Sequence, residues 1–253
     1  MDMPINTLKR NLREGKTQIG CWLSLGNTIA AEICAAAGFD WVLIDTEHAP
    51  NDLVEVHQQL LAVSAFSASP VVRAAWNDTV VIKRLLDVGV QSLLIPYVQN
   101  EEEARRAAAA VRYPPHGIRG VSTGSRSSRF GRVKDYLPHA HAEICVLVQI
   151  ETRQGLENVE KIAAVEGIDG LFVGPQDLAA DLGHLGNPGH PEVQAAIAAV
   201  IARTRKAGKA AGILYFDEAG AKRWIQQGAQ MIAVTSDSAM LVRESSTIAA
   251  KHR

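Results

Sequence analysis

Residues 40–50 read DWVLIDTEHAP, in which the apolar run 41–44 passes directly into the polar run 45–48. A short, continuous run rich in Val, Ile and Leu is typical of a strand that is covered on both faces, as in a parallel sheet. The abrupt change to charged side chains indicates that the strand ends where polar groups gather. Runs of the same kind recur along the chain, and their recurrence determines the fold.

Eight short apolar runs are spaced over the 253 residues, and helical patterns with apolar residues three or four apart separate them. The predicted strands are 18–23, 40–45, 70–74, 91–95, 144–150, 170–173, 210–214 and 230–235. The predicted helices are 51–66, 79–88, 104–111, 156–165, 193–207 and 218–227. Glycine is free of strain in the left-handed position after a helix, and helices are predicted to end at Gly38, Gly89, Gly167, Gly208 and Gly228.

Eight strands alternating with helices, without a break in composition, predict a single (β/α)8 TIM barrel over residues 1–253. An open doubly wound sheet is the alternative, and it would normally carry a glycine-rich phosphate loop after its first strand. The segment 24–32, SLGNTIAAE, does not match that fingerprint.

One connection, 113–142, is rich in Pro, Gly, Ser and Arg and is about 30 residues long, which in a compact domain usually indicates a functional role. Its three spaced arginines could hold an anion, although a solvated or intersubunit face is the commoner role of such a cluster. These arginines are Arg126, Arg129 and Arg132.

The charge balance argues against several classes of partner. The chain has 26 basic and 27 acidic residues, so it lacks the basic surface expected of a protein that binds nucleic acid or an anionic membrane. Its apolar runs are far shorter than the roughly 20 residues of a membrane span, and no secretory signal is evident. The widely spaced Cys21, Cys34 and Cys145 are typical of reduced, buried thiols in a cytoplasmic protein.

In a TIM barrel the active site lies at the C-terminal ends of the strands. Most of the predicted strands run into polar side chains at that end, and burying so many charged groups without partners would be costly. We therefore expect one site there. Its candidate residues are Trp22, Asp45, Glu47, His48, Arg73, Gln149, Glu151, Gly174, Pro175, Asp177, Tyr215, Asp217, Thr235, Ser236 and Asp237.

Glu151 and Asp177 are the predicted metal ligands. They are two carboxylates from neighbouring strands, without a Cys or a His-rich cluster, and such a donor set suits a hard divalent ion such as Mg²⁺ or Mn²⁺. The structural alternative is that each residue only caps the helix that follows it.

Arg73 is a candidate catalytic residue, because a permanently charged, fork-shaped side chain can hold an anionic substrate or stabilise an enolate. The alternative is a structural ion pair with Asp45 or Glu47. His48 could transfer a proton near neutral pH, with Asp45, three residues earlier, fixing its tautomer.

Long motifs extending from about residue 18 to the last strand resemble the HpcH/HpaI family of class II pyruvate aldolases. They are FDWVLIDTEHAPND, PVVRAAWND, LLDVGVQSLLIPYVQN, RYPPHGIRGV, VLVQIETRQGLEN and DGLFVGPQDLAADLGHLGNPGHPEV. The resemblance implies reversible cleavage of 4-hydroxy-2-oxo acids, such as 4-hydroxy-2-oxoheptanedioate, to pyruvate and an aldehyde such as succinic semialdehyde. It also implies a divalent cofactor (Mg²⁺, Mn²⁺ or Co²⁺) and a homohexamer in which paired subunits exchange the last helix.

The resemblance assigns roles residue by residue. The metal ligands match Glu151 and Asp177, the contact to the keto or enolate oxygen matches Arg73, and the acid–base pair matches Asp45 and His48. Residues that match the pyruvate-binding positions are Trp22, Gln149, Gly174, Pro175, Gln176 and Asp177, and Asp87 matches a residue that approaches the site from a neighbouring subunit. Gln176 stands where relatives often have a small residue, so it bears on the choice of aldehyde.

Three alternatives to this activity can be compared with the sequence. Aldolases of the 2-dehydro-3-deoxyglucarate or 2-keto-3-deoxy-rhamnonate type share the pyruvate half of the site. A non-catalytic barrel would be expected to lose at least one of the four main candidates, and all are present. A Schiff-base aldolase needs a lysine at the C-terminal end of a strand, whereas Lys83, Lys161 and Lys222 fall in predicted helices and Lys209 begins a strand.

Overall fold

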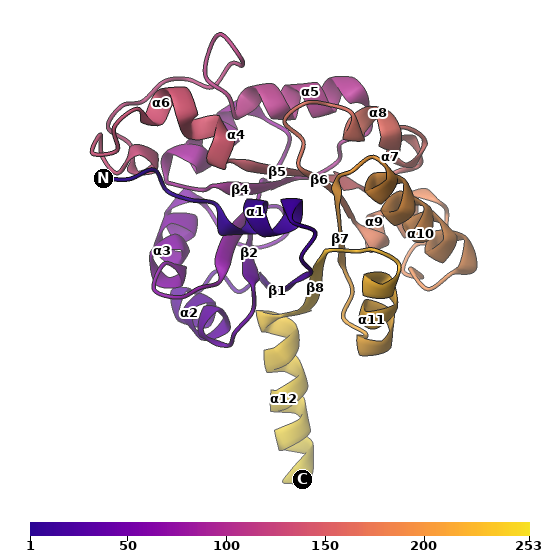
Figure 1. Ribbon diagram of the computed structural model, residues 1–253. Helices are drawn as coiled ribbons and strands as arrows, with labels where there is room; N and C mark the ends of the chain where they lie inside the picture. The colour runs from indigo at the N-terminus through magenta and orange to yellow at the C-terminus, as the bar shows by residue number, and fades with distance from the viewer.

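The computed structural model describes residues 1–253 and consists of eight parallel strands closed into a barrel in sequence order (Figure 1). The strands are β1 Gln18–Leu23, β2 Trp41–Asp45, β3 Ser69–Arg73, β4 Ser92–Ile95, β5 Cys145–Ile150, β6 Gly170–Val173, β7 Ala210–Leu214 and β8 Met231–Ser236. The predicted TIM barrel is therefore confirmed. Each observed strand agrees with its predicted range to within one residue at either end, which is within the usual uncertainty of strand boundaries.

Helices surround the barrel. They are α1 Thr7–Arg13, α2 Thr28–Ala36, α3 Leu53–Val63, α4 Thr79–Asp87, α5 Glu101–Ala110, α6 Tyr136–His139, α7 Arg153–Glu157, α8 Val159–Ala163, α9 Pro175–Asp181, α10 Pro191–Lys206, α11 Glu218–Gln226 and α12 Asp237–Lys251. The single helix predicted over 156–165 is wrong: α7 ends at Glu157 and α8 begins at Val159. Between them, the Asn158 side chain donates to the backbone oxygens of Gln154 and Gln99. The five glycines predicted to end helices have positive φ angles, as expected.

The barrel interior is a separate hydrophobic core from the layer between the strands and the helices. Two large rings, Trp41 and Phe172, fill it and meet edge to face at 6.5 Å. Glycines on neighbouring strands make room for these rings: an added Cβ would lie 2.1 Å from the Trp41 ring at Gly20 and 2.3 Å from the Phe172 ring at Gly212. The interior is thus packed solid, and ligands can only reach its ends.

Helix α1 closes the N-terminal end of the barrel. Leu8 and Leu12 pack into the interior core beside residues that begin strands β5, β7 and β8. Lys9 is buried there, where its ammonium group forms an ion pair with Asp169 at 3.3 Å. The remaining, C-terminal end of the barrel is left for a site.

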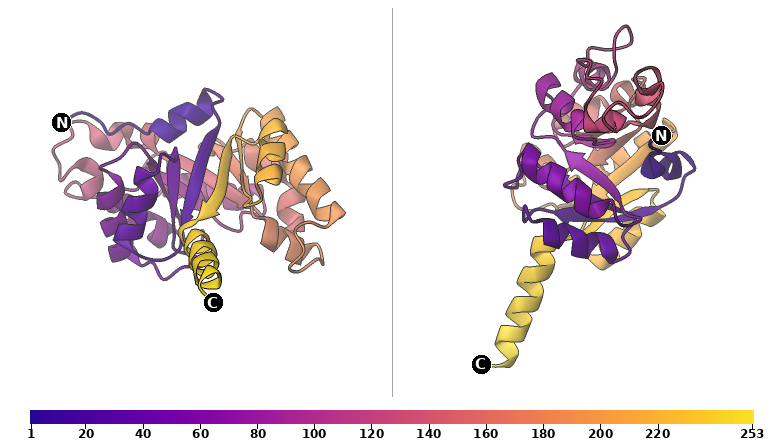
Figure 2. Two further views of the ribbon diagram at one scale, coloured as in Figure 1. Left: turned by 90° about the horizontal axis from the view of Figure 1, so that it is seen from below. Right: turned by 90° about the vertical axis from the view of Figure 1, so that its left-hand side faces the viewer.

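Helix α12 projects away from the barrel as an isolated rod (Figures 1 and 2). Only Asp237, its first residue, is buried, and it holds the turn after β1 by accepting hydrogen bonds from the backbone N–H groups of Ser24 and Leu25 at 2.9 and 3.1 Å. Large apolar side chains farther along the helix are exposed; these are Leu241, Val242 and Ile248. No helix in the structure combines the length and apolar character needed to cross a bilayer.

Candidate active site

Parallel strands bring the predicted polar residues to one rim at the C-terminal end of the barrel. Asp45 and Arg73 are paired in register at the ends of β2 and β3. Gln149 and Glu151 are at the end of β5, beside β6, which leads into Asp177 on α9. The side chains form two groups on this rim, which differ in how their charges are compensated.

The first group, the Arg73 cluster, consists of Arg73, Asp45, Glu47 and Trp22. Arg73 donates from Nε and Nη2 to the two carboxylate oxygens of Asp45 at 2.8 and 2.6 Å, and its Nη1 lies 2.8 Å from Glu47 Oε2. The Trp22 ring lies under the guanidinium, 5.0 Å from its centre, while the indole N–H donates to Asp45 at 3.2 Å. The guanidinium is therefore fixed by a bidentate pair, a second carboxylate and an aromatic face.

The ionisation of this cluster follows from these contacts. Burial on its own would raise the pKa of Asp45, but the hydrogen bonds and charge of Arg73 outweigh it and hold the pKa below its usual value. Burial opposes the charge on Arg73 as well, yet Asp45 and Glu47 raise its pKa. At Glu47 burial prevails over Arg73, and the pKa is raised. The contacts thus favour the charged forms of both Asp45 and Arg73.

The expected side-chain pair of Asp45 and His48 is wrong. His48 is exposed, and its bond to Asp45 is made by the backbone N–H, at 3.4 Å from Oδ1. Both Asp45 oxygens already accept hydrogen bonds from Arg73, so the carboxylate orients the guanidinium and not the imidazole. The ion pair considered as the structural alternative for Arg73 is present, and it positions Arg73 within the site.

The second group, the Glu151 cluster, consists of Glu151, Asp177, Gln149 and Tyr97. Glu151 accepts hydrogen bonds from the Tyr97 backbone N–H at Oε1 and from Gln149 Nε2 at Oε2, both at 2.8 Å. The Tyr97 hydroxyl donates to Asp177 Oδ1 at 3.1 Å. Neither carboxylate forms an ion pair with a Lys, Arg or His of the chain, so two acidic groups share the site without a cation of their own.

Burial raises the pKa of Glu151 to about 8, and the nearby Asp177 and Glu47 carboxylates add to the effect against the Tyr97 N–H and Arg73. Burial and the Asp177 charge likewise raise the pKa of the Tyr97 hydroxyl to about 12, so that it remains a donor. A raised carboxylate pKa in a charged cleft is a common signature of a functional site.

Helix capping does not account for Glu151. Thr152 caps α7, its hydroxyl accepting from the Gly155 N–H at 3.0 Å, so Glu151 is left with its side chain directed to the rim. Asp177 lies in the first turn of α9, whose N-cap residue is Gly174. The side chain of Asp177 is therefore bonded to Tyr97 instead of capping the helix.

Gly174 is required by the position of Glu151. A Cβ at Gly174 would lie 2.3 Å from Glu151 Oε2 and 3.2 Å from Gln149 Nε2. Pro175 then starts α9, and Gln176 is exposed beside a groove that it shares with the segment after β7. The turn that the sequence analysis assigned to substrate binding thus borders the Glu151 cluster.

The chain belongs to a known enzyme family. The family model described as HpcH/HpaI aldolase/citrate lyase matches residues 18–243, nearly the whole barrel. This chain is a member of that family. The resemblance found in the sequence is thereby confirmed.

Relatives and solved structures agree with the family assignment. A protein named pyruvate aldolase from Rhizobium etli is 58% identical over 251 residues, covering 99% of each chain. A 4-hydroxy-2-oxo-heptane-1,7-dioate aldolase from Salmonella dublin is 55% identical over 247 residues, covering 97% of this chain and 94% of that one. A crystal structure of a family protein from Burkholderia cenocepacia superposes with a TM-score of 0.95 at 42% identity, covering 98% and 99% of the two chains.

The donors of the Glu151 cluster fit the divalent ion expected in an HpcH/HpaI enzyme. Two carboxylates stand together without a cation, and Gln149 Oε1 is buried without a hydrogen-bond partner. All of these donors are oxygens, and no Cys or His is among them, which suits Mg²⁺, Mn²⁺ or a similar hard ion.

A second set of potential ligands, His184, His190 and Glu192, lies at the start of α10 and in the segment before it. The two rings are stacked, with centroids 3.5 Å apart and planes at 16°, so a single ion could not lie in both ring planes. His184 Nε2 lies 2.8 Å from Glu192 Oε2, and His190 caps α10. These contacts account for the cluster without a metal.

The sequence analysis did not include Tyr97. It lies two residues after the end of β4 and has a positive φ of 51°, which is unusual for a residue other than glycine and often marks a functional position. Its ring packs against Trp76, with centroids 5.5 Å apart and planes tilted by 32°. Its place just after the fourth strand is the signal in the sequence that would have predicted Tyr97 as a rim residue.

Other expected rim residues have structural roles. Asp217 caps α11 through the Gly220 N–H, and Ser236 caps α12. Asp87 ends α4 and forms an ion pair with the buried Arg119 at 3.0 Å, at the N-terminal side of its own barrel. Its approach to a neighbouring subunit's site therefore stays a prediction.

Proposed function

We propose that this chain is a divalent-metal-dependent aldolase that reversibly cleaves 4-hydroxy-2-oxo acids into pyruvate and an aldehyde. The proposed substrate resembles 4-hydroxy-2-oxoheptanedioate, with succinic semialdehyde as the aldehyde. The observation that carries the proposal is the presence on one rim of a fixed guanidinium, Arg73, and of two carboxylates, the buried Glu151 and the half-buried Asp177, that form no ion pair. An anionic keto acid and a divalent ion would complement these two groups.

Arg73 is proposed to bind the keto oxygen and to stabilise the charge that develops there when the C3–C4 bond breaks. Asp45 and Glu47 hold the guanidinium in place before substrate arrives, so little reorganisation is needed during the reaction. A preorganised donor of this kind is worth about 3–4 kcal/mol of barrier reduction. Trp22 supports the guanidinium from below and closes the barrel side of the site.

The pyruvate carboxylate is proposed to bind at the turn formed by Gly174, Pro175 and Gln176. The absence of a side chain at Gly174 lets Glu151 approach the backbone of this turn, so the carboxylate and keto groups of one small acid could contact both clusters. Gln149 lies within the Glu151 cluster, and its side-chain amide donates to Glu151. Gln176, exposed beside the groove, is proposed to contact the aldehyde portion.

His48 is proposed to accept the proton of the C4 hydroxyl. The imidazole is exposed, so it can exchange that proton with solvent, and it stands on the loop that Asp45 anchors through the backbone. Asp45 contributes by positioning the loop and Arg73 together.

Glu151 and Asp177 are proposed to hold the divalent ion, Mg²⁺, Mn²⁺ or Co²⁺. The bound ion supplies Lewis acidity, which polarises the keto group and stabilises negative charge on its oxygen. Tyr97 orients the two carboxylates, donating from its backbone N–H to Glu151 and from its hydroxyl to Asp177. The raised pKa of Glu151 means that this side chain gives up a proton when it takes a cation.

Pyruvate release from a panel of 4-hydroxy-2-oxo acids tests the proposal. The highest kcat/KM is expected for a seven-carbon dicarboxylate, and activity should vanish after exhaustive chelation and return with Mg²⁺ or Mn²⁺. A panel that includes 2-dehydro-3-deoxyglucarate and 2-keto-3-deoxyrhamnonate separates the related activities. Full activity in chelator, or a pyruvate adduct trapped by borohydride, would contradict the metal-dependent reaction.

We also propose that the protein is a cytoplasmic homohexamer whose paired subunits exchange α12. The exposed apolar residues Leu241, Val242 and Ile248 support the exchange, because a helix with such a face is usually covered. Light scattering of the intact chain should give six copies, and the double substitution Leu241→Glu and Val242→Glu should reduce that number. A monomer in the intact protein would refute the assembly.

A further inference from the structure

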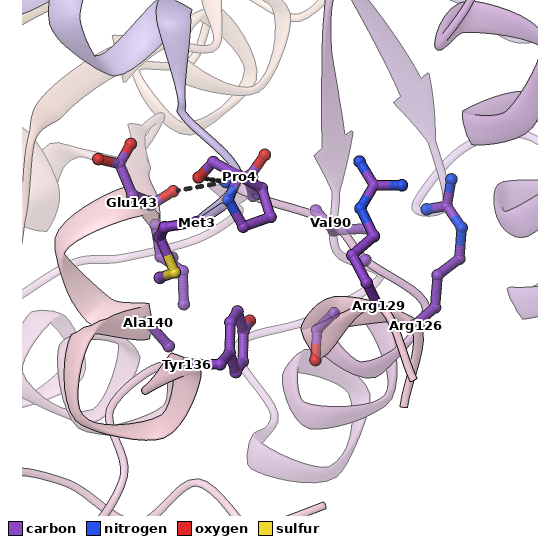
Figure 3. Close-up of a pocket in the computed structure, with 12 residues that line it drawn as sticks. Met3, Pro4, Val90, Arg126, Arg129, Tyr136, Ala140 and Glu143 are labelled. Carbon is purple, nitrogen blue, oxygen red and sulfur yellow. Dashed lines mark hydrogen bonds between the residues drawn. The ribbon is translucent and has the colours of Figure 1, made fainter. Parts of the chain in front are cut away.

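A pocket opens on the barrel face opposite the active site, between the N-terminal segment and the 113–142 connection (Figure 3). Gly89 and Gln91 of its wall come just before β4, and Ile144 comes just before β5. The pocket thus lies at the N-terminal ends of these strands, whereas the Glu151 cluster lies at their C-terminal ends. A four-residue strand such as β4 separates the two faces by about 13 Å.

Arg126 and Arg129 line this pocket and also an adjoining groove beside β3. Neither guanidinium forms an ion pair with an acidic residue of the chain, whereas Arg73 and Arg119, the buried arginines, are both paired. Glu143 is the only acidic residue among all those that line the two cavities. Its carboxylate is already engaged, with Arg10 at 3.0 Å and the Asn6 N–H at 2.6 Å.

The two guanidinium groups lie near each other. Figure 3 shows them side by side, across the pocket from Pro4 and Glu143. Burial lowers the pKa of Arg126, and the charge of Arg129 adds to this effect, as expected for neighbouring cations. Each positive charge therefore raises the electrostatic free energy of the other, and an anion bound between them would offset this repulsion.

The backbone is shaped to produce this arrangement. Arg126 Nη1 donates to the backbone oxygen of Val88 at 3.0 Å, and its side chain passes over Gly89, where an added Cβ would lie 2.5 Å from Nη1. Arg129 and Phe130 have positive φ angles of 53° and 59°, which turn the chain so that Arg129 comes beside Arg126. Consecutive left-handed residues other than glycine are costly, and such strain is concentrated at binding sites.

We propose that Arg126 and Arg129 bind a small dianion of the phosphate class, either inorganic phosphate or a phosphate monoester. One carboxylate is satisfied by a single guanidinium fork, whereas two adjacent forks match the several oxygens and double charge of a phosphate. The proposal does not depend on the aldolase reaction, because its residues lie on the other face. The sequence left a solvated or intersubunit role open for these arginines, and a carboxylate from a second copy is the competing occupant.

Calorimetric titration of the intact protein with inorganic phosphate at constant ionic strength tests the site. We expect one phosphate per chain, a Kd that rises about tenfold or more in Arg126→Gln and in Arg129→Gln, and no measurable binding in the double variant. Arg132→Gln is the matched control, because Arg132 belongs to the same connection but does not line the pocket, and its Kd should stay within about twofold. Sulfate should compete at equal concentration, and acetate should not.

Several outcomes would overturn the proposal. Phosphate binding that persists in the double variant would place the anion at another site, such as Arg73. An equal loss in Arg132→Gln would indicate general electrostatic attraction. Absence of saturable binding to the wild-type protein, or a change in copy number on light scattering of the double variant without phosphate binding, would assign the arginines to another role. Arg129 is exposed, so Arg129→Gln and Arg129→Lys test the site even if Arg126 variants fail to fold.

Discussion

The two clusters on the rim shift the pKa of a buried carboxylate in opposite directions. In the Arg73 cluster, Asp45 is held ionised with a pKa below its usual value, because the chain supplies the cation. In the Glu151 cluster, the chain supplies none, and burial raises the pKa of Glu151 to about 8. The difference teaches that the first cluster is complete in itself, whereas the second needs a cation from outside to carry its full charge.

Glu151→Gln should have the largest effect, because it removes the charge that distinguishes the second cluster. We expect kcat for pyruvate release to fall by about a thousandfold or more, with loss of measurable Mn²⁺ binding. A coupled pyruvate assay and calorimetry with Mn²⁺ check the two effects. Glu157→Gln, in which an exposed carboxylate on α7 is changed in the same way, should leave both unchanged. Activity within tenfold of wild type in Glu151→Gln would contradict the placement of the metal site in this cluster.

Arg73→Lys should lower kcat/KM by about 100- to 1,000-fold, because an ammonium cannot bridge both Asp45 oxygens and the keto oxygen at once. If the clusters are independent, the Kd for Mn²⁺ should change by less than about threefold. The exposed Arg84→Lys serves as the control. A large change in Mn²⁺ affinity in Arg73→Lys would show that the two clusters act as one unit.

Gly174→Ala should weaken Mn²⁺ binding by about 100-fold without altering any charged residue. The added Cβ would lie 2.3 Å from Glu151 Oε2, so the carboxylate would have to move. Overpacking of this kind also costs about 1–3 kcal/mol of stability. Gly124→Ala is the matched control, since an added Cβ there meets nothing within 4 Å. Thermal melts and Mn²⁺ titrations check both effects, and unchanged affinity would mean that Glu151 can move freely.

Tyr97→Phe should weaken Mn²⁺ binding by about tenfold, because the hydroxyl that orients Asp177 is lost while the backbone bond to Glu151 remains. Tyr113→Phe provides the matched control: the Tyr113 hydroxyl is buried without a hydrogen-bond partner, so its removal breaks no bond. Equal Mn²⁺ affinities in Tyr97→Phe and wild type would limit Tyr97 to a packing role.

The last expected effect is a pH dependence of the Glu151 cluster. A protonated Glu151 must lose its proton before it holds a cation, so Mn²⁺ affinity should increase by up to tenfold per pH unit below about 8 and release close to one proton. Without metal, a folded-state pKa raised above its ordinary value of 4.5 stabilises the protein at low pH, and this contribution is lost as pH rises through about 8. Calorimetry in buffers of different ionisation enthalpy checks the proton count, and pH-independent binding between 6 and 8 would contradict it.

Much of the barrel and of the site was predictable because a parallel barrel converts local patterns into position. An apolar run followed by a charged residue places that residue on the rim, which is how Glu151, Asp177 and Arg73 were found. The same reasoning fails for His48, because a separation of three residues does not bring its imidazole to the Asp45 carboxylate. Arg73, 28 residues away but paired with Asp45 in register, takes that carboxylate instead.

Features that depend on backbone angles and on distant packing were not predictable. The left-handed φ of Tyr97 directs its N–H and hydroxyl to two different carboxylates, and no residue pattern announces that angle. Glycine is likewise required at position 174 because the side chain of Glu151, which follows another strand, approaches the backbone there. Helix α1 was not predicted, because its two buried leucines form too short a pattern to indicate a helix. These leucines nevertheless close the barrel.

The projecting helix α12 also affects the resistance of the chain to proteolysis. It has 15 residues, of which only the first is buried, so in a solitary chain a protease could cut it without any unfolding of the barrel. If α12 is exchanged as proposed, a partner shields the same peptide bonds. Chain lifetime would then rise with protein concentration, and subunits that fail to find a partner would be the first to be degraded.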